Sequence, residues 1–446
     1  MSAAFRFIHA ADLHVDSPFR GLAVAPERIR EALAESTFAA VRHLVDSAIE
    51  HEVEFVVISG DLYDAADRSL RAQLALKREW ERLCAKSVQL FVIHGNHDHL
   101  SGARASLDWP ESVTVFGADK VDHKPAFNKN GELIAYIHGI SYGTRAVTDN
   151  LAARYKALPD MPYQIALLHG NVDGDASHDP YAPCSLYELA ASEFDYWALG
   201  HVHQRAVLHT YPHVVYPGNT QGRHTREQGA KGCYLVDVSA AKETELTFIE
   251  LDAVRWETVI TDIADLTTEQ SLLEAMENAI VTMAADCGGR PLMLKLVLTG
   301  RGPMHRKVSE SSFIQELLEE LRSRFDLDEY GAHESAAEWI WLIGLETRTG
   351  AELDPELLSA EDSFAGELYR QCASGWKDGS GLALEEEALA PLLANPRLRK
   401  LIRSVSERQK QEWILQAREL TLGLLTDEAE SAAAGMPETS GEEARQ

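Results

Sequence analysis

The stretch FVVISGDLYD, residues 55–64, is an apolar run that ends in a glycine and a carboxylate. Four other apolar runs also end in polar or charged side chains: FRFIHAADLH (5–14), LFVIHGNHD (90–98), QIALLHGN (164–171) and YWALGHVH (196–203). These runs are hydrophobic throughout and do not alternate with polar residues, which is typical of strands covered on both faces. Helical patterns lie between them. The sequence therefore predicts an α/β layered fold for this part of the chain.

The pattern changes after the α/β region, and we expect domains at 1–252, 253–349 and 350–426. Residues 253–349 read strand, helix, strand, helix, strand, which indicates a compact second domain. The third region is helical and contains the apolar stretch EWILQARELTLGLL (412–425), which must bury its surface within the chain or against a partner. Residues 427–446 carry six acids against one base, so we expect a disordered tail.

Charge limits the classes of partner. The chain has 42 basic and 70 acidic residues in 446, a net charge of −28. Such a surface repels polyanions, so any nucleic-acid contact must be local. One basic island lies within residues 201–233. It contains Arg205, Arg223, Arg226 and Lys231 against a single acid, Glu227.

Location is inferred from hydropathy and cysteine usage. No stretch approaches the roughly 18 uncharged apolar residues of a membrane helix. His9 and Asp12 interrupt the N-terminus before an apolar signal segment could form. The five cysteines are far apart and form no CxxC pair, as expected of reduced thiols. We therefore expect a cytoplasmic protein without a membrane partner.

Metal-binding side chains follow the apolar runs, at the points where strands should end. They are Asp12 and His14, Asp61, Asn96 followed by His97 and Asp98, His169, and His201 and His203. In layered α/β folds, ligands gather beyond the carboxyl ends of strands, so these residues are expected to converge. A lone histidine at a strand end is more often structural, but the whole series indicates a metal centre. Sixteen of the 18 histidines lie in the first 224 residues, which agrees with this interpretation.

The ligand types suit two divalent cations. Asp61 follows Gly60, whose missing side chain permits close approach of the loop, and a carboxylate has two oxygens that can bridge two cations. Cations at roughly 3.5 to 4 Å from each other stabilise both the attacking and the leaving oxygen of an in-line displacement at phosphorus. Phosphoester hydrolysis is therefore the predicted chemistry.

The motifs DxH, GDxxD, GNHD, a later histidine and GHxH resemble those of the calcineurin-like metallophosphoesterase superfamily. Within it, the chain resembles the bacterial YhaO-type DNA repair exonucleases, relatives of the SbcD double-strand-break nuclease. The segments that carry this resemblance are ADLHVDSPF (11–19), GISY (139–142), YPGNTQGRH (216–224) and KGCYLVDV (231–238). The resemblance implies a four-layer α/β/β/α metallophosphoesterase sandwich, a small α+β capping domain and a helical C-terminal region that docks an ATPase.

The resemblance also implies two metal sites that share Asp61. One cation would be bound by Asp12, His14, Asp61 and His203, and the other by Asp61, Asn96, His169 and His201. Manganese is the expected metal, and iron or zinc would suit the same mixed ligands. A water molecule activated by the metals would be the nucleophile.

The expected catalytic residues are His97 and Asp98. His97 would stabilise the transition state or protonate the leaving sugar oxygen, Asp98 would orient it, and Asp64 would give similar support. For Asp98 and Asp64, turn or cap chemistry is the alternative.

The predicted function is a two-metal-dependent DNA nuclease, an exonuclease of DNA repair. Its expected partners are DNA, an ATPase subunit of the SMC-like or AAA type and a second copy of the chain. DNA phosphates would contact Arg223, His224 and Arg226, for which a solvated loop is the alternative. A phosphatase or phosphodiesterase for a protein or a small molecule would use the same centre. A non-catalytic scaffold of an ATPase complex is disfavoured by the complete ligand set.

Overall fold

The computed structural model describes most of the chain: residues 3–19, 25–64, 69–102, 107–174, 179–325, 339–352, 355–370, 389–403, 405–406, 409, 413, 415–418 and 420–421. The chain divides into two compact units, and the first contains Met1–Thr258, Val281–Lys295 and Arg324–Ile343. The second contains the remaining residues. The domain boundaries expected from the sequence stay predictions.

Two six-stranded sheets form most of the first unit. The first sheet has the order β12-β11-β1-β2-β3-β4 and the second has the order β5-β6-β7-β8-β10-β9. The strands of the first sheet are β1 (Phe5–Ala10), β2 (Phe55–Ser59), β3 (Gln89–Ile93), β4 (Val113–Val115), β11 (Gly232–Val238) and β12 (Thr244–Glu250). Those of the second are β5 (Asp122–Phe127), β6 (Leu133–Gly139), β7 (Gln164–His169), β8 (Tyr196–Gly200), β9 (Ala206–Thr210) and β10 (His213–Tyr216).

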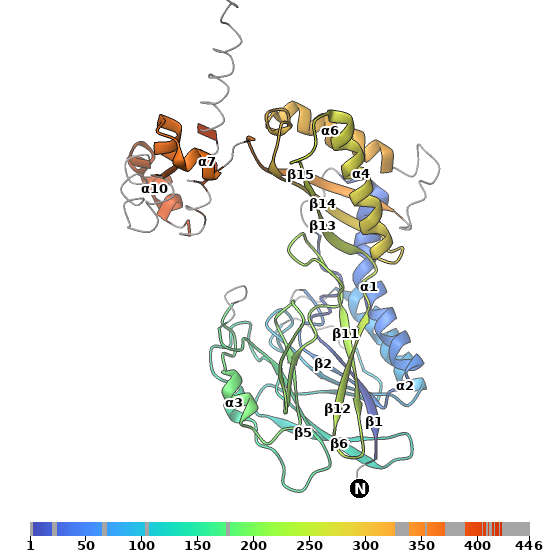
Figure 1. Ribbon diagram of the computed structural model, residues 1–446. Coiled ribbons are helices and arrows are strands. Elements are labelled where there is room, and N and C mark those ends of the chain that lie inside the picture. Colours follow the sequence, from blue (N-terminus) through green and yellow to red (C-terminus); the bar gives the residue numbers. More distant parts are fainter. Residues whose placement is uncertain are drawn as a thin grey trace, which may run out of the picture. The chain divides into compact units, whose positions relative to one another are not determined.

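Helices cover the outer face of the first sheet, as Figure 1 shows. Helices α1 (Glu27–Glu50) and α2 (Leu70–Ala85) pack their apolar sides on the first sheet. The outer face of the second sheet is covered by loops, the short turn η1 (Ala152–Arg154) and the five-residue helix α3 (Leu186–Ala190). The predicted four-layer α/β/β/α order is confirmed, with a thin fourth layer.

Aromatic side chains fill the space between the two sheets. The ring of Phe7 stacks on Phe55 with centroids 5.0 Å apart and meets the edge of Tyr196, from the second sheet, at 5.4 Å. His9 also lies in this layer, with its ring nitrogens 3.1 Å from the Tyr196 hydroxyl and from the carbonyl oxygen of Leu199. Burial lowers the pKa of His9 to about 3, so the ring is neutral. The sheets are thus joined by packing and by hydrogen bonds.

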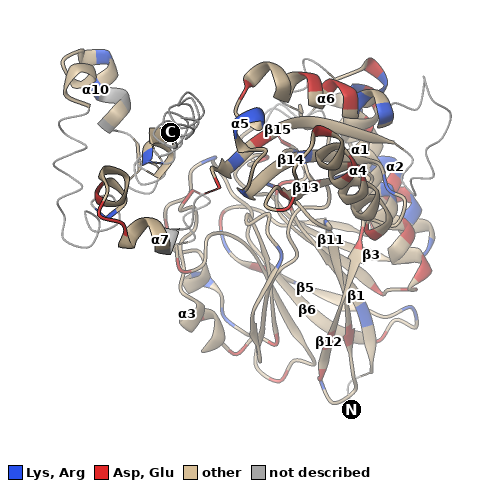
Figure 2. Cartoon of the chain, turned by 45° about the horizontal axis from the view of Figure 1, so that its top comes forward, with Lys and Arg blue, Asp and Glu red and all other residues tan. Residues whose placement is uncertain are grey.

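A three-stranded sheet follows the sandwich, in the strand order β13-β14-β15. The predicted order of strand, helix, strand, helix and strand is present, with one additional short helix, α5: β13 (Arg255–Asp262), α4 (Glu269–Asp286), β14 (Leu292–Arg301), α5 (His305–Val308), α6 (Ser311–Phe325) and β15 (Ile340–Gly350). Acidic side chains recur along α4 and α6, as Figure 2 shows.

The C-terminal part contains α7 (Pro355–Ala360) and α10 (Pro396–Arg403) among its described helices. The predicted acidic tail at 427–446 and much of the apolar stretch at 412–425 lie outside the described residues. Of the helices that the structure describes, none is both long and apolar enough to cross a membrane.

Candidate metal centre

The predicted ligands come together where strands of both sheets end. Strands β1, β2 and β3 are parallel neighbours, and so are β6, β7 and β8, so their carboxyl ends lie at one edge of each sheet. The ligands follow these ends: Asp12 and His14 after β1, Asp61 after β2, Asn96 after β3, His169 at the end of β7, and His201 and His203 after β8. Residues far apart in the sequence therefore form one cluster.

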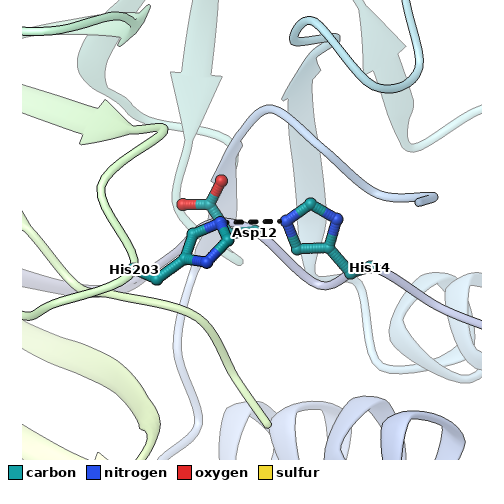
Figure 3. A group of neighbouring side chains, drawn as sticks. All are labelled: Asp12, His14 and His203. Atoms are coloured by element: carbon teal, nitrogen blue, oxygen red, sulfur yellow. Dashed lines mark hydrogen bonds between the residues drawn. The ribbon is translucent and has the colours of Figure 1, made fainter. Parts of the chain in front are cut away.

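One group of side chains consists of Asp12, His14 and His203. One ligand atom of each lies within 4.8 Å of those of the other two. The Nε2 atoms of His14 and His203 are 3.2 Å apart, and Figure 3 shows the two rings pointing these nitrogens at each other beside the Asp12 carboxylate. His14 is fully buried, whereas the His203 side chain is 17% exposed.

A second group consists of Asp12, Asp61 and His169, again with ligand atoms within 4.8 Å of one another. Oδ2 of Asp61 lies 3.5 Å from Nε2 of His169 and 3.9 Å from Nε2 of His14, which places this oxygen between the two groups. Oδ1 of Asn96 is 3.0 Å from Nε2 of His169. Nδ1 of His169 faces the carbonyl oxygen of Ser59 at 2.9 Å, so it carries the proton and Nε2 is the nitrogen suited to bind a metal.

His201 joins the cluster mainly through its backbone. Its N–H donates to both carboxylate oxygens of Asp12, at 3.2 and 3.1 Å. The His201 ring packs against that of His169 with centroids 5.2 Å apart, and its Nε2 lies 2.9 Å from the carbonyl oxygen of Asp179. If Nε2 of His201 bound a metal, the metal would take the place of the Asp179 carbonyl oxygen as the partner of this nitrogen.

The charges of the cluster fit divalent cations. Asp12 and Asp61 are each about 1% exposed. Burial, together with the charge of Asp61, raises the pKa of Asp12 well above its usual value. Burial also raises the pKa of Asp61 to about 7, with a further rise from the charge of Asp98. Two desolvated carboxylates this close are unfavourable as anions, and cations held between them and the imidazoles would remove that cost.

The backbone at the ligands is strained. Asp12, His14, Asp61 and His201 have φ angles of 53°, 42°, 52° and 97°, in the left-handed region that residues with a side chain rarely adopt. Such strain persists only where the surrounding structure enforces it, and it is common at functional sites. Gly95 shows how closely the loops approach, because a Cβ there would lie 2.4 Å from Oδ1 of Asp61 and 2.6 Å from Nε2 of His169.

His97 lies beside the cluster, and its orienting partner differs from the expected one. Nδ1 of His97 is 2.8 Å from the backbone carbonyl oxygen of Asp64. The carboxylate of Asp98 instead accepts hydrogen bonds from the N–H groups of Leu62 and Gly95, at 2.9 and 2.8 Å, and lies 2.8 Å from Nδ1 of His94. Asp98 therefore holds the loop through backbone hydrogen bonds, which is the turn role given above as the alternative. The residue that contacts Nδ1 of His97 is Asp64, through its backbone carbonyl.

The predicted basic island is not a continuous exposed surface. The Arg223 side chain is 12% exposed and forms ion pairs with Asp64 and Glu227. Lys231 is buried, and the guanidinium of Arg205 lies over the ring of Phe248 at 4.0 Å. Carboxylates therefore already engage Arg223, and an aromatic ring engages Arg205. Of the three predicted DNA contacts, Arg223, His224 and Arg226, only the last two are exposed.

Glu227 is a site residue whose role the sequence patterns do not reveal beyond its charge. It is 5% exposed, and Oε1 lies 2.6 Å from Nδ1 of His203. Burial raises its pKa, but the hydrogen bond from His203 and the charge of Arg223 outweigh burial, so the pKa lies below the usual range. A lone acid in a basic loop, four residues after an arginine, is the signal that could have found it.

Comparison with known proteins identifies the family. Residues 5–205 match the family described as calcineurin-like phosphoesterase, and residues 256–350 match the middle domain of metallophosphoesterase YhaO. The chain is 40% identical over 364 residues to the "Uncharacterized metallophosphoesterase YhaO" of Bacillus subtilis, covering 81% of this chain and 86% of that protein. The chain belongs to the YhaO family of calcineurin-like metallophosphoesterases. The resemblance seen in the sequence motifs is thus confirmed.

More distant relatives are named DNA double-strand break repair protein Mre11. The protein of Sulfurisphaera tokodaii is 28% identical over 206 residues, which cover 46% of this chain and 50% of that protein. The protein of Archaeoglobus fulgidus is 22% identical over 407 residues, covering 86% of this chain and 87% of that protein.

Family membership implies a metal-dependent phosphoester hydrolase that uses divalent cations. The donor set fits that implication, since buried carboxylates, imidazoles and an amide oxygen converge on one place.

Proposed function

We propose that the protein is a two-metal-dependent DNA nuclease, an exonuclease that acts in DNA repair. The observation that carries this proposal is the single buried cluster in which Oδ2 of Asp61 lies between His14 and His169. A shared carboxylate between two groups of ligands suits two cations and therefore phosphodiester hydrolysis. Similarity to proteins named DNA double-strand break repair protein Mre11 supports DNA as the substrate.

The ligands are proposed to divide between two sites that share Asp61. One site would use Asp12, His14, Asp61 and His203, and the other would use Asp61, Asn96, His169 and His201. Bound there, the cations would activate a water molecule and offset the charge that develops on the phosphate oxygens. We propose manganese, and the ligands would also suit iron or zinc.

His97 is the proposed proton donor. A carbonyl oxygen only accepts hydrogen bonds, so the contact with Asp64 places a proton on Nδ1 of His97. Nε2, at the other edge of a ring that is 35% exposed, can then deliver a proton to the leaving sugar oxygen when the ring carries both protons. The N–H of His97 also donates to Oδ1 of Asp61 at 3.0 Å, which fixes the distance of His97 from the metal ligands.

The experiment that tests this function is digestion of end-labelled DNA by the metal-reconstituted protein. Single-stranded and double-stranded substrates are compared with bis(p-nitrophenyl) phosphate, in Mn²⁺, Mg²⁺, Zn²⁺ or Fe²⁺. We expect stepwise shortening of DNA, strongest with Mn²⁺, and none in the Asp61→Asn variant. Turnover of the small ester without any DNA cleavage would contradict the nuclease proposal and favour a phosphodiesterase with another substrate. No turnover of either would favour a scaffold.

We also propose that the C-terminal region docks an ATPase subunit of the SMC-like or AAA type, as the resemblance implies. In the described part of that region, Trp413, Leu415 and Leu420 are 42%, 43% and 66% exposed. Apolar side chains on a helix suit a partner's hydrophobic groove. The full-length protein with Trp413→Asp and Leu420→Asp should lose co-purification with the ATPase but keep turnover of the small ester. Retained co-purification would place docking on another surface.

A further inference from the structure

A network centred on Arg223 connects two acids that lie behind histidines of the metal centre. Its guanidinium donates from Nη1 to Oδ1 of Asp64 at 2.7 Å and from Nη2 to Oε1 of Glu227 at 3.3 Å. Oδ1 of Asp64 lies 3.3 Å from Nδ1 of His14. Oε1 of Glu227 lies 2.6 Å from Nδ1 of His203. One cationic side chain therefore holds the acids behind both histidines.

These contacts determine which ring nitrogen faces the metal. A carboxylate only accepts hydrogen bonds, so His203 carries its proton on Nδ1 and presents Nε2 as an acceptor. Nδ1 of His14 is buried close to Asp64 but is not aligned for a hydrogen bond, and the negative charge favours a proton on this nitrogen too. The two Nε2 atoms then face each other across 3.2 Å with their lone pairs, an arrangement that a cation stabilises.

The loop between β10 and β11, which carries Arg223 and Glu227, is held by several hydrogen bonds. The backbone N–H of Arg223 and the amide of Asn219 donate to Oε2 of Glu227, at 2.8 and 3.0 Å. Gln221 donates to the carbonyl oxygen of Val254 at 2.6 Å, so the middle of the loop is tied to the residue that precedes β13. Side chains whose own positions are fixed in this way can orient a neighbouring ligand.

We propose that Arg223 and Glu227 are positioning residues for the metallophosphoesterase reaction. Glu227 sets the tautomer and the direction of His203, and Arg223 keeps Glu227 and Asp64 in place behind the histidines. This inference rests on the metal centre of the proposed function. It does not depend on DNA as the substrate.

The sign of the change in metal affinity separates positioning from simple electrostatics. A guanidinium near the centre repels a divalent cation, so on charge alone its removal should strengthen metal binding. Loss of a group that orients ligands should instead weaken metal binding, typically by about 10- to 100-fold. The two explanations of Arg223 therefore predict opposite results.

The first experiment measures Mn²⁺ affinity of the full-length protein by competition with a chromogenic chelator. Arg223→Ala and Arg223→Lys should both bind Mn²⁺ about 10- to 100-fold more weakly, because lysine keeps the charge but cannot reach two carboxylates with a planar fork. Arg205→Ala is the matched control, since this arginine of the same chain segment lies over Phe248 and should leave the affinity unchanged. Unchanged or stronger binding by Arg223→Lys, with a melting temperature near that of the wild type, would overturn the role of Arg223.

The second experiment tests whether Glu227 acts through the histidine. Glu227→Ala should weaken Mn²⁺ binding, and Glu227→Gln should restore part of it because an amide oxygen still accepts the hydrogen bond from His203. Nitrogen NMR of the metal-free protein should show the His203 proton on Nδ1 in the wild type and a mixture of tautomers in Glu227→Ala. The double variant with Arg223→Lys and Glu227→Ala should lose less free energy of Mn²⁺ binding than the sum of the losses in the two single variants. An unaltered tautomer, or strictly additive losses, would overturn the network.

Discussion

The backbone N–H of His97 donates a hydrogen bond of 3.0 Å to Oδ1 of Asp61. This bond joins the proposed shared metal ligand to the proposed proton donor. Oδ2, the other oxygen of the same carboxylate, is the atom between His14 and His169. Asp61 thus has one oxygen at the metal centre and one that holds the loop of His97. Substitutions of Asp61 and of His97 should therefore have different consequences.

Asp61→Asn should abolish turnover and lower metal occupancy, because a neutral amide replaces the carboxylate between two cation sites. Elemental analysis of the purified protein and turnover of bis(p-nitrophenyl) phosphate check this expectation. Asp149→Asn, at an exposed carboxylate that pairs with Arg154, is the control and should behave like the wild type. Full occupancy by two metals together with normal turnover would refute the shared role of Asp61.

His97→Ala should keep the metals and slow cleavage by about 10²- to 10⁴-fold, the usual contribution of a general acid or base. Metal content and single-turnover rates on end-labelled DNA separate binding from chemistry. His99→Ala, two residues further along the same loop, should leave the rate within a small factor of the wild type. If His97→Ala lost DNA affinity and rate in equal measure, His97 would be a binding residue.

Gly95→Ala should disrupt the centre although it adds only a methyl group. The new Cβ would lie 2.4 Å from Oδ1 of Asp61 and 2.6 Å from Nε2 of His169, distances that real contacts do not reach. We expect at least a tenfold loss in metal affinity, measured by chelator competition. Gly117→Ala is the matched control, because a Cβ there meets nothing within 4 Å. Equal affinities of the two variants would show that the ligand loops can move apart freely.

The buried ring of His9 should make folding depend on pH below neutrality. Burial lowers its pKa from 6.5 to about 3, so between these values the unfolded chain binds a proton that the folded chain does not. The contribution of His9 to the free energy of unfolding is therefore complete above pH 6.5. Below that pH it falls with decreasing pH, by up to about 1.4 kcal/mol per pH unit. Urea unfolding of the metal-free protein between pH 6.5 and 5 should show a shallower pH dependence in His9→Gln. Parallel curves for both proteins would contradict this account.

Arg226→Ala should weaken DNA binding and reduce its salt dependence, since the side chain is exposed in the loop next to the metal centre. Each lost contact with a duplex phosphate should lower the slope of log affinity against log salt by about 0.9. Fluorescence anisotropy with labelled duplex at several salt concentrations gives the slope. Arg154→Ala, at an exposed arginine that pairs with Asp149, is the control for removal of a surface charge. An unchanged slope in Arg226→Ala would place the DNA elsewhere.

The sequence predicted the elements that position the site because buried strands leave a strong signal. Runs such as residues 55–59 are apolar at every position, and the residue types that follow them are the ones that metals use. The same reasoning placed Asp61 and His169 at strand ends, where the structure has them. Chain order and the usual behaviour of parallel strands were sufficient for this prediction.

Partners within the loops could not be predicted in the same way. Asp98 and Asp64 both follow a strand closely, and only the folded loops decide that Asp64 meets His97 while Asp98 binds backbone N–H groups. Arg223 carries a full charge in the sequence, but the charge is matched by Asp64, 159 residues away. Side-chain pairs of this kind depend on packing between distant segments, which local sequence patterns do not encode.

The proposed ligands come from both sheets of the sandwich, since Asp61 and Asn96 follow strands of the first and His169 ends a strand of the second. Cations bound to all three would hold the two sheets together, and the sheets could not separate without releasing them. By mass action, a ligand at 100 times its dissociation constant adds about 2.7 kcal/mol to the free energy of unfolding. The stability of the folded protein would therefore depend on the supply of free metal around it, and metal starvation would make the chain easier for proteases to cleave.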